Sequence, residues 1–300
     1  MSRKIIYIIN PVSGTKKGND LRKIIEDKTK DKGFAYDIFP SVADGNYSFL
    51  HSLIKEEKIT DVIIAGGDGT ISGVVGSLLN ENVNFGIIPR GSGNGLALCA
   101  KISKQPAIAL DIIFNGNASP IDGFFINDRF ACMLAGLGFD AKVAHEFAVH
   151  PKRGLRTYAQ LTLKHFFSVH PFRFQIKLAK EKFATEAFFI SIANSNQFGN
   201  NFTIAPKASL TDGLLDIVIV TSQNKVSFLL QTLKQVAGWN VLESSSFIKQ
   251  KSGVIYFQTD KIEIINSSAA PLHVDGDPAE TPDKLLIEVK KKCFRLIQPA

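Results

Sequence analysis

The feature that most constrains the fold is a glycine-rich turn placed between a buried strand and an amphipathic helix. Residues 61–65 form a short apolar run, typical of a strand that is covered on both faces. The turn Gly66-Gly67-Asp68-Gly69-Thr70 follows at once. Apolar residues then recur at the spacing of one helix face, at Ile71, Val74, Val75, Leu78 and Leu79. A strand followed directly by a covering helix is the building unit of a parallel sheet, so the sequence predicts an α/β domain here.

The rest of the first 121 residues repeats this unit. Three more strands are expected at Lys4–Asn10, Phe34–Phe39 and Phe85–Pro89. One helix is expected after a cap at Asp20. Another is expected over the stretch that contains Tyr47, Leu50, Leu53 and Ile54. We therefore expect a Rossmann-like parallel sheet over residues 1–121, covered by helices.

Beyond residue 122 the pattern is typical of an antiparallel β-sandwich. Short runs rich in β-branched and aromatic residues alternate with turn residues. The runs are Phe130–Leu134, Phe172–Leu178, Ala187–Ala193, Leu215–Val220, Val254–Phe257, Ile262–Ile265 and Leu285–Val289. Two helices are expected among them, near Arg156–Phe167 and Lys225–Ala237. We expect this second domain over residues 122–291, with residues 292–300 returning to the first domain.

The glycine-rich turn has the properties of an anion site. Glycines let the backbone approach a ligand closely, and a helix N-terminus offers free N–H groups. The spacing excludes both the GxxxxGK[ST] phosphate loop and the GxGxxG dinucleotide motif. Asp68 would repel a phosphate unless Mg²⁺ bridged the two charges or the carboxylate held an acceptor hydroxyl. Two further loops, at residues 10–14 and 89–94, follow other strands, so we expect all three loops at one edge of the sheet.

The composition narrows the class of partner. The net charge of +7 suits nucleotide phosphates, anionic lipid headgroups or nucleic acid, but no nucleic-acid-binding motif is present. The three cysteines lie far apart in the sequence, which argues against a disulfide framework or a zinc site. No apolar run is long enough to span a bilayer. We therefore expect a cytoplasmic protein, whose contact with membrane would be peripheral and at the inner face.

The motifs of the first domain resemble the diacylglycerol kinase catalytic-domain family, which includes bacterial lipid kinases, sphingosine kinases and ceramide kinases. These motifs are Asn10-Pro11-Val12-Ser13-Gly14, Gly66 to Thr70, and Pro89-Arg90-Gly91-Ser92-Gly93-Asn94. The resemblance continues in the second domain, at Gly136-Leu137-Gly138-Phe139-Asp140, Ile204-Ala205-Pro206, Asp212-Gly213-Leu214-Leu215-Asp216 and Val274-Asp275-Gly276-Asp277-Pro278. It implies an ATP- and Mg²⁺-dependent lipid kinase of phospholipid metabolism. The first domain would bind the nucleotide and the second domain the lipid.

The same resemblance implies roles for individual residues. The nucleotide would lie against Asn10, Ser13, Gly14, Ser41, Gly66, Gly67, Asp68, Gly69, Thr70, Arg90, Gly91, Ser92 and Asn94. Mg²⁺ would be held by the Asp212 carboxylate and by the main-chain carbonyls of Ser209 and Leu214, with a water network reaching Asp122 and Asp68. Asp277 would accept the proton of the lipid hydroxyl, with Asp68 and Asp275 as further catalytic candidates.

Two of these segments also have an ordinary structural interpretation. Asp212-Gly213 is typical of a hairpin turn, and Asp275 could equally be a turn residue. The chain also departs from the family pattern in three places. Asp277 replaces the usual glutamate, Ser92 replaces a frequent threonine, and Gly199-Asn200-Asn201 replaces a run of glycines. These departures leave the identity of the lipid open.

Alternative functions remain at this point. An NAD kinase or phosphofructokinase type of enzyme also uses a Gly-Gly-Asp-Gly loop but acts on soluble substrates. A non-catalytic protein that binds lipid or nucleotide is the alternative outside the enzymes. The basic and aromatic segment Lys152–Phe167 could rest on an anionic membrane or simply pack as an ordinary helix. The oligomeric state is open, with a homodimer as one option.

Overall fold

The computed structural model describes residues 3–14, 18–151, 155–166, 168–199, 202–203, 205, 207–221, 249–251 and 253–300. The chain divides into two compact units. The first unit is Met1–Ile121 with Lys292–Ala300, and the second is Asp122–Lys291. Two long strands, β5 (Asn117–Ile126) and β18 (Lys284–Gln298), each contribute residues to both units.

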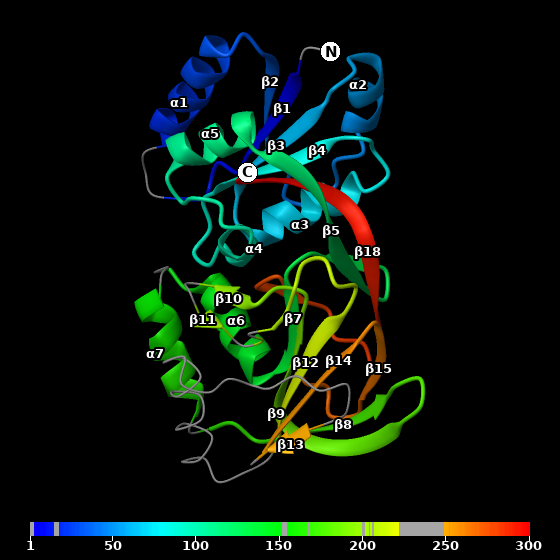
Figure 1. Cartoon of the computed structure of the whole chain (residues 1–300). Coiled ribbons are helices and arrows are strands. Elements are labelled where there is room, and N and C mark those ends of the chain that lie inside the picture. The colour runs from blue at the N-terminus through cyan, green and yellow to red at the C-terminus, as the bar shows by residue number, and fades with distance from the viewer. Residues whose placement is uncertain are drawn as a thin grey trace. The chain divides into compact units, whose positions relative to one another are not determined.

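The first unit is built on a parallel sheet, as predicted (Figure 1). Its strands are β1 (Lys4–Ile9), β2 (Ala35–Pro40), β3 (Asp61–Gly66) and β4 (Asn84–Pro89), in the order β2-β1-β3-β4. Neighbouring strands all run parallel. The end of β18 continues the sheet, with Arg295 paired in parallel to Asn84 of β4. All six residues of β3 are buried, which agrees with the continuous apolar run in the sequence.

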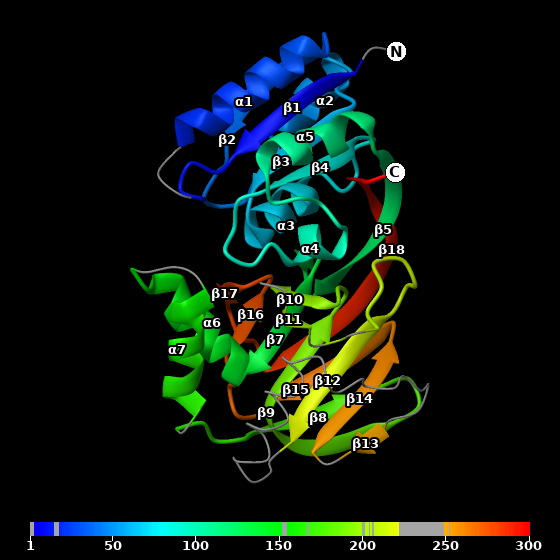
Figure 2. The same cartoon turned by 60° about the vertical axis from the view of Figure 1, so that its left-hand side comes forward.

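Five helices accompany this sheet in the described residues (Figure 2). They are α1 (Gly18–Asp31), α2 (Leu50–Glu56), α3 (Asp68–Ser77), α4 (Gly95–Cys99) and α5 (Pro106–Asn115). α1 packs against α5, α5 packs against β4, and α3 packs against β3. The sheet and helices together give the α/β arrangement that the sequence predicts.

Two predicted helix boundaries are wrong, and both for the same reason. Tyr47 precedes α2, and Leu78 follows α3, although each side chain is almost fully buried. The backbone N–H of Tyr47 is bonded to the Ser77 hydroxyl, so the loop before α2 is anchored to the end of α3. Apolar residues at helical spacing indicate buried side chains. A loop that packs on the core can bury its side chains at the same spacing, so the pattern extended the predicted helices too far.

The second unit is antiparallel in every strand pairing described within it. Its strands are β6 (Arg129–Ala131), β7 (Leu134–Gly138), β8 (Phe172–Lys177), β9 (Lys182–Ala193), β12 (Leu215–Thr221), β13 (Lys249–Lys251), β14 (Val254–Thr259), β15 (Lys261–Asn266), β16 (Leu272–Val274) and β17 (Asp277–Ala279), with β10 (Gln197–Gly199) and β11 (Phe202–Thr203) as a separate pair. One core cluster draws residues from β7, β9, β12 and β14 and from β8, β15, β16 and β18. The predicted antiparallel β-sandwich is therefore confirmed.

A second, smaller apolar cluster lies beneath two helices of this unit. Helix α6 (Phe139–Val149) contributes Phe139 and Val143, and α7 (Leu155–Phe166) contributes Leu161. They pack against Phe188 of β9 and Val218 of β12. The sequence predicted α7 but not α6. The predicted helix Lys225–Ala237 lies outside the described residues.

The predicted strand Phe130–Leu134 is in fact two strands, β6 and β7. The chain leaves the ladder at Cys132 and Met133, because their backbone N–H groups donate to the carboxylate of Asp275 instead of to a neighbouring strand. Within the part of the chain that the structure covers, no helix combines the length and the apolarity needed to cross a bilayer.

Candidate functional site

The loops after the parallel strands begin side by side at one edge of the sheet. The N–H of Asn10 donates to the carbonyl of Ala65, and that of Arg90 donates to the carbonyl of Gly66, both at 2.9 Å. The N–H of Ser41 donates to the carbonyl of Ile9, also at 2.9 Å. The four strands therefore present residues 10–14, 41, 67–70 and 90–94 at the same edge, where open α/β sheets bind ligands.

Side chains tie the first loop to the glycine-rich turn. The Nδ2 of Asn10 donates to the Thr70 hydroxyl at 2.9 Å, while its Oδ1 accepts the N–H of Val12 at 3.0 Å. The Ser13 hydroxyl donates to the Asn10 carbonyl at 3.0 Å. Asn10 thus fixes the loop 10–14 against the first turn of α3.

The loop 90–94 is held even more closely against this turn. An ideal Cβ on Gly91 would lie 2.6 Å from the α-carbon of Gly67, so only glycine permits this approach of the two backbones. Asn94 adopts a left-handed conformation with φ 55° and is buried. Its side chain accepts the N–H of Gly91 and donates to the Gly91 carbonyl, both at 2.7 Å. Ser92, between them, is exposed.

Asp68 is the first residue of α3, and its side chain is only 8% exposed. Its carboxylate accepts the N–H groups of Gly95 at 3.0 Å and Leu96 at 3.2 Å, at the start of α4. Two helix N-termini therefore stabilise its negative charge. Because an amide accepts through only one of its two heavy atoms, we expect Asp68→Asn to destabilise this loop.

Arg90 lies next to Gly14, and one of its side-chain donors has no partner among the described residues. Gly14 has φ +86°, and an ideal Cβ there would lie 2.4 Å from the Arg90 guanidinium. The Nε of Arg90 is buried and has no hydrogen-bond partner among the described residues. A buried guanidinium N–H beside a glycine turn fits an anionic ligand such as phosphate, which would supply the missing acceptor.

In the second unit, the structure brings Asp122 beside the predicted metal loop. Asp122 is fully buried, and its Oδ2 accepts the N–H of Gly213 at 2.7 Å. Its own N–H donates to the Leu210 carbonyl at 2.7 Å. The Oδ1 of Asp212 accepts the N–H of Leu214 at 3.1 Å. Partial burial raises the pKa of the Asp212 carboxyl and the charge of Asp122 raises it further, whereas Lys291 lowers it.

The loop of residues 209–214, which we call the acidic loop, could bind a cation through few side chains. Among the described residues, no three His, Cys, Asp or Glu side chains gather as metal ligands. Main-chain carbonyls and water would therefore have to complete any coordination shell around the Asp212 carboxylate. Asn194, fully buried, donates its Nδ2 to the carbonyls of Asp122 at 2.9 Å and Cys132 at 3.0 Å, and its Oδ1 has no partner in the described residues. That unsatisfied acceptor next to Asp122 fits a bound water, and no sequence motif pointed to Asn194.

Asp216 ends the same motif but is part of the core. It is fully buried, and it accepts the Tyr256 hydroxyl and, at 3.2 Å, the Nε2 of Gln258. Burial raises the pKa of its carboxyl above the ordinary value of 3.8, and the two hydrogen bonds oppose that rise.

A pH-dependent stability follows for Asp216. Because its folded-state pKa is raised, the folded state holds the proton more tightly, and stability falls as pH rises from about 3.8 through the folded pKa. Asp216→Asn removes this loss. We expect the free energy of unfolding of the variant, relative to the parent protein, to increase between pH 4 and pH 7 in urea titrations. A difference that stays constant over this range would contradict the assignment.

The Asp275-Gly276-Asp277 motif forms a two-residue hairpin turn between β16 and β17. Asp275 and Gly276 have φ of +51° and +87°, and Val274 pairs with Asp277 across the turn. The Asp275 carboxylate is buried and accepts the N–H groups of Cys132 at 3.1 Å, Met133 at 3.0 Å and Leu134 at 2.8 Å. Asp277 is exposed. The first aspartate therefore anchors the hairpin, and the second lies at the protein surface.

The sequence also gave no role to a buried pair next to this hairpin. The Nε2 of His273 lies 3.4 Å from the Oδ2 of Asp140, and the two residues are 2% and 6% exposed. Gly136 pairs with His273 in the sheet, and an ideal Cβ on it would lie 1.9 Å from the same Asp140 oxygen. Gly136 makes room for the Asp140–His273 pair, so a glycine at this position is the sequence feature that could have indicated the pair.

Two family profiles match nearly the whole chain. The diacylglycerol kinase catalytic domain matches residues 4–126, and the YegS C-terminal NAD kinase beta sandwich-like domain matches residues 134–298. An uncharacterized Synechocystis protein is 31% identical over 72% of this chain, which spans only 50% of that relative. A probable YegS-like lipid kinase of Chromohalobacter salexigens is 27% identical, with 75% of this chain and 71% of the relative aligned. The diacylglycerol kinase of Bacillus subtilis is 24% identical, with 91% and 89% aligned.

The fold has a solved counterpart. The crystal structure of a putative diacylglycerol kinase from Bacillus anthracis superposes with a TM-score of 0.80 and 20% sequence identity, covering 99% of this chain and 97% of the other. At that identity the likeness establishes the architecture of the chain.

Proposed function

The chain belongs to the diacylglycerol kinase catalytic-domain family, and from this premise we propose that it is a lipid kinase that transfers the γ-phosphate of ATP to a lipid hydroxyl. Its relatives include proteins named lipid kinase and diacylglycerol kinase. The lipid is a diacylglycerol- or sphingosine-like molecule. Such a reaction demands an anion-binding loop for the nucleotide and a carboxylate for the acceptor hydroxyl.

The observation that carries the proposal is the loop edge of the first unit. The backbones of Gly67 and Gly91 approach closely there, and Arg90 carries a buried N–H that has no acceptor among the described residues. The nucleotide phosphates would lie along residues 66–70 and 90–94, with Arg90 supplying a charge-assisted hydrogen bond. Asn10, Ser13 and Ser41, at the same edge, would provide further polar contacts.

A divalent cation fits the acidic loop of the second unit. Asp212 would hold it through its carboxylate, and Ser209 and Leu214 through their carbonyls. Asp122 and Asn194 lie beside this loop and would orient its water molecules. When bound, Mg²⁺ would supply positive charge against the developing charge on the transferred phosphoryl group.

The chain's own residues would do the remaining work. Asp277 would orient the lipid hydroxyl and accept its proton as the oxygen attacks the γ-phosphorus atom, with ADP leaving. The backbone N–H groups of the glycine-rich turn and Arg90 would stabilise the charge on the phosphoryl oxygens. Positioning and charge stabilisation therefore account for the catalysis, because little covalent chemistry falls to the protein.

A product assay tests the proposal directly. The purified chain is incubated with radiolabelled ATP, MgCl₂ and separate acceptors: diacylglycerol, sphingosine, phosphatidylglycerol, NAD and fructose 6-phosphate. We expect label in a lipid product on thin-layer plates. Label in NADP would instead support an NAD kinase type of enzyme. ATP binding without label in any product would support a non-catalytic binding protein.

A glycine pair tests the nucleotide site. Gly14 and Gly33 both have positive φ, +86° and +70°, but only at Gly14 would a Cβ meet Arg90, since nothing lies within 4 Å at Gly33. Alanine at either position costs a similar backbone strain of roughly 1–2 kcal/mol. Displacing Arg90 should remove a charge-assisted bond, so we expect Gly14→Ala to weaken ATP binding about 10- to 100-fold. Calorimetric titration should show ATP binding to Gly33→Ala unchanged; equal affinities for the two variants would contradict the site.

We also propose that the protein works in the cytoplasm and reaches its lipid by peripheral contact with anionic membrane. Its net charge of +7 supports such contact, since anionic lipids attract basic surfaces. Sedimentation with vesicles of phosphatidylcholine alone and of phosphatidylcholine with phosphatidylglycerol would test it. We expect binding to the anionic vesicles that falls as salt rises.

A further inference from the structure

Asp277 begins the short strand β17, and the position of this strand depends on the neighbouring strands and helix. β16 and β17 have three residues each, and hairpins of this size are not stable alone. β17 pairs only with β16 among the described strands, and β16 pairs in turn with β7. Helix α6 packs against both strands of the hairpin. The direction in which Asp277 is presented is therefore set by β7 on one side and by α6 on the other.

Two polar contacts between α6 and the hairpin each involve a histidine. His145 of α6 has its Nε2 2.6 Å from the carbonyl of Leu272 in β16. Asp140, in the first turn of α6, lies 3.4 Å from His273 of β16. Both members of this second pair are nearly inaccessible to solvent, so water competes little for the contact.

The pair is built into the sheet. Gly136 pairs with His273, and the absence of a side chain at Gly136 leaves the space that the Asp140 carboxylate and the His273 ring occupy. His273 is only four residues before Asp277, and it also pairs with Pro278, the residue after Asp277. Any shift of His273 would therefore move Asp277 with it.

We propose that Asp140 and His273 are positioning residues that hold the β16–β17 hairpin so that Asp277 meets the acceptor hydroxyl. This inference rests on the proposed lipid kinase function and adds two residues to its machinery. Misplacing a catalytic group by about 1 Å can cost about 100-fold in rate. The pair should therefore act on kcat through Asp277 and leave nucleotide binding unchanged.

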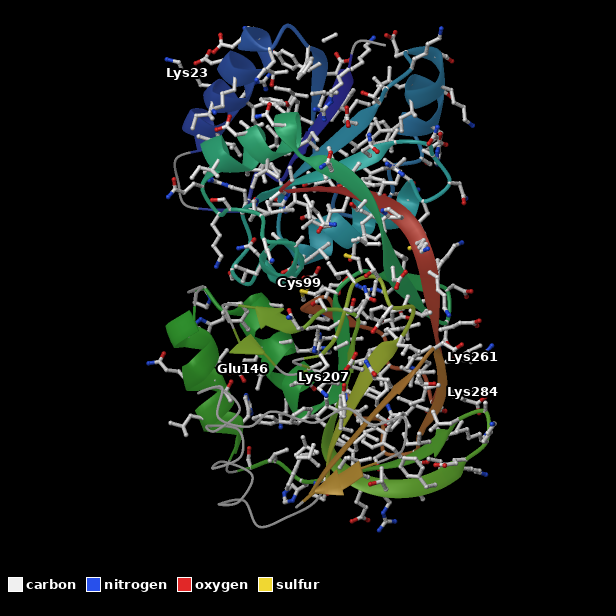
Figure 3. All side chains as sticks on the ribbon, viewed as in Figure 1. Lys23, Cys99, Glu146, Lys207, Lys261 and Lys284 are labelled. Carbon is white, nitrogen blue, oxygen red and sulfur yellow. The ribbon has the colours of Figure 1, made fainter. Side chains whose placement is uncertain are left out.

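The test compares two carboxylate-to-amide changes on the same helix. Asp140→Asn and His273→Gln break the pair at the hairpin. Glu146→Gln is the matched control: Glu146 (labelled in Figure 3) also contacts a histidine, but this histidine, His165, belongs to α7 and not to the hairpin. We expect about a 10- to 100-fold loss of kcat for the first two variants, unchanged KM for ATP, and less than a twofold change for the control.

A double-mutant cycle separates positioning from general destabilisation. In the Asp277→Asn background, Asp140→Asn should lower the residual rate little, because the group it positions is already gone. An equal fold-loss in both backgrounds, or a change confined to KM for the lipid, would overturn the proposal. The second result would mean that Asp140 contacts the lipid itself.

Hydrogen exchange gives a readout independent of activity. Amides of residues 274–281 should exchange faster in Asp140→Asn and His273→Gln than in the parent protein, and at the parent rate in Glu146→Gln. Unchanged exchange in the first two variants would overturn the positioning role. If exchange changes as expected but the parent protein phosphorylates no lipid, the proposed function fails while the structural coupling stands.

Discussion

Asp277→Asn is expected to lower kcat for lipid phosphorylation by about 10²- to 10⁴-fold, the range over which a general base contributes. The asparagine keeps the shape of the side chain but cannot accept a proton. Asp277 is exposed on a two-residue hairpin, so we expect the melting temperature to change by no more than about 2 °C. Initial rates with saturating ATP and a lipid dispersed in detergent micelles provide the measurement.

Two further variants bracket this result. Glu280→Gln removes another exposed carboxylate from the same region and should leave kcat within a factor of two of the parent rate. Asp277→Glu restores the residue that the family pattern carries here and should retain at least a tenth of the activity. If the kcat of Asp277→Asn equals that of the parent protein, Asp277 is not the proton acceptor and another carboxylate has that role.

Asp275→Ala is expected to unfold the second unit far more readily than any other substitution in this motif. Its carboxylate accepts three backbone N–H groups, from Cys132, Met133 and Leu134, in a buried setting. Each donor left without a partner costs about 1–3 kcal/mol. We expect the free energy of unfolding to fall by about 3 kcal/mol or more, measured by urea denaturation followed by circular dichroism.

The control for this change is Asp128→Ala, in the exposed turn between β5 and β6. Removing an exposed aspartate should alter stability by no more than about 0.5 kcal/mol. Equal stabilities of the Asp275 and Asp128 variants would show that the three hydrogen bonds contribute nothing net. Substitutions of these two aspartates, which are separated by one glycine, are thus expected to have different effects. Replacing Asp275 lowers the stability of the protein, and replacing Asp277 lowers kcat.

The sequence could predict much of the first unit because the information there is local. A continuous apolar run marks the buried strand β3, and a glycine-rich turn followed by helical spacing marks α3. In a parallel sheet the loops after the strands meet at one edge, so the sequence alone predicts that the loops at residues 10–14, 66–70 and 90–94 lie together. The second unit was recognisable as antiparallel for a similar reason, from short β-branched runs between turns.

Only the tertiary structure could decide what each carboxylate does. Asp68, Asp122 and Asp275 accept backbone N–H groups from residues 27, 91 and 142 positions away in the sequence. No local pattern reports such partners, so the sequence made Asp68 and Asp275 look alike as catalytic candidates. The same long-range bonds divided the predicted strand Phe130–Leu134 in two.

What the sequence determined by itself is the set of elements and the order of loops along the chain, because periodicity and turn chemistry act over a few residues. What the tertiary structure decided is which polar groups are already satisfied inside the protein and which remain for a ligand. Buried carboxylates need donors, and only the folded chain brings those donors within hydrogen-bond distance. The buried Nε of Arg90 has no partner among the described residues, and Asp277 differs from the buried aspartates in being exposed.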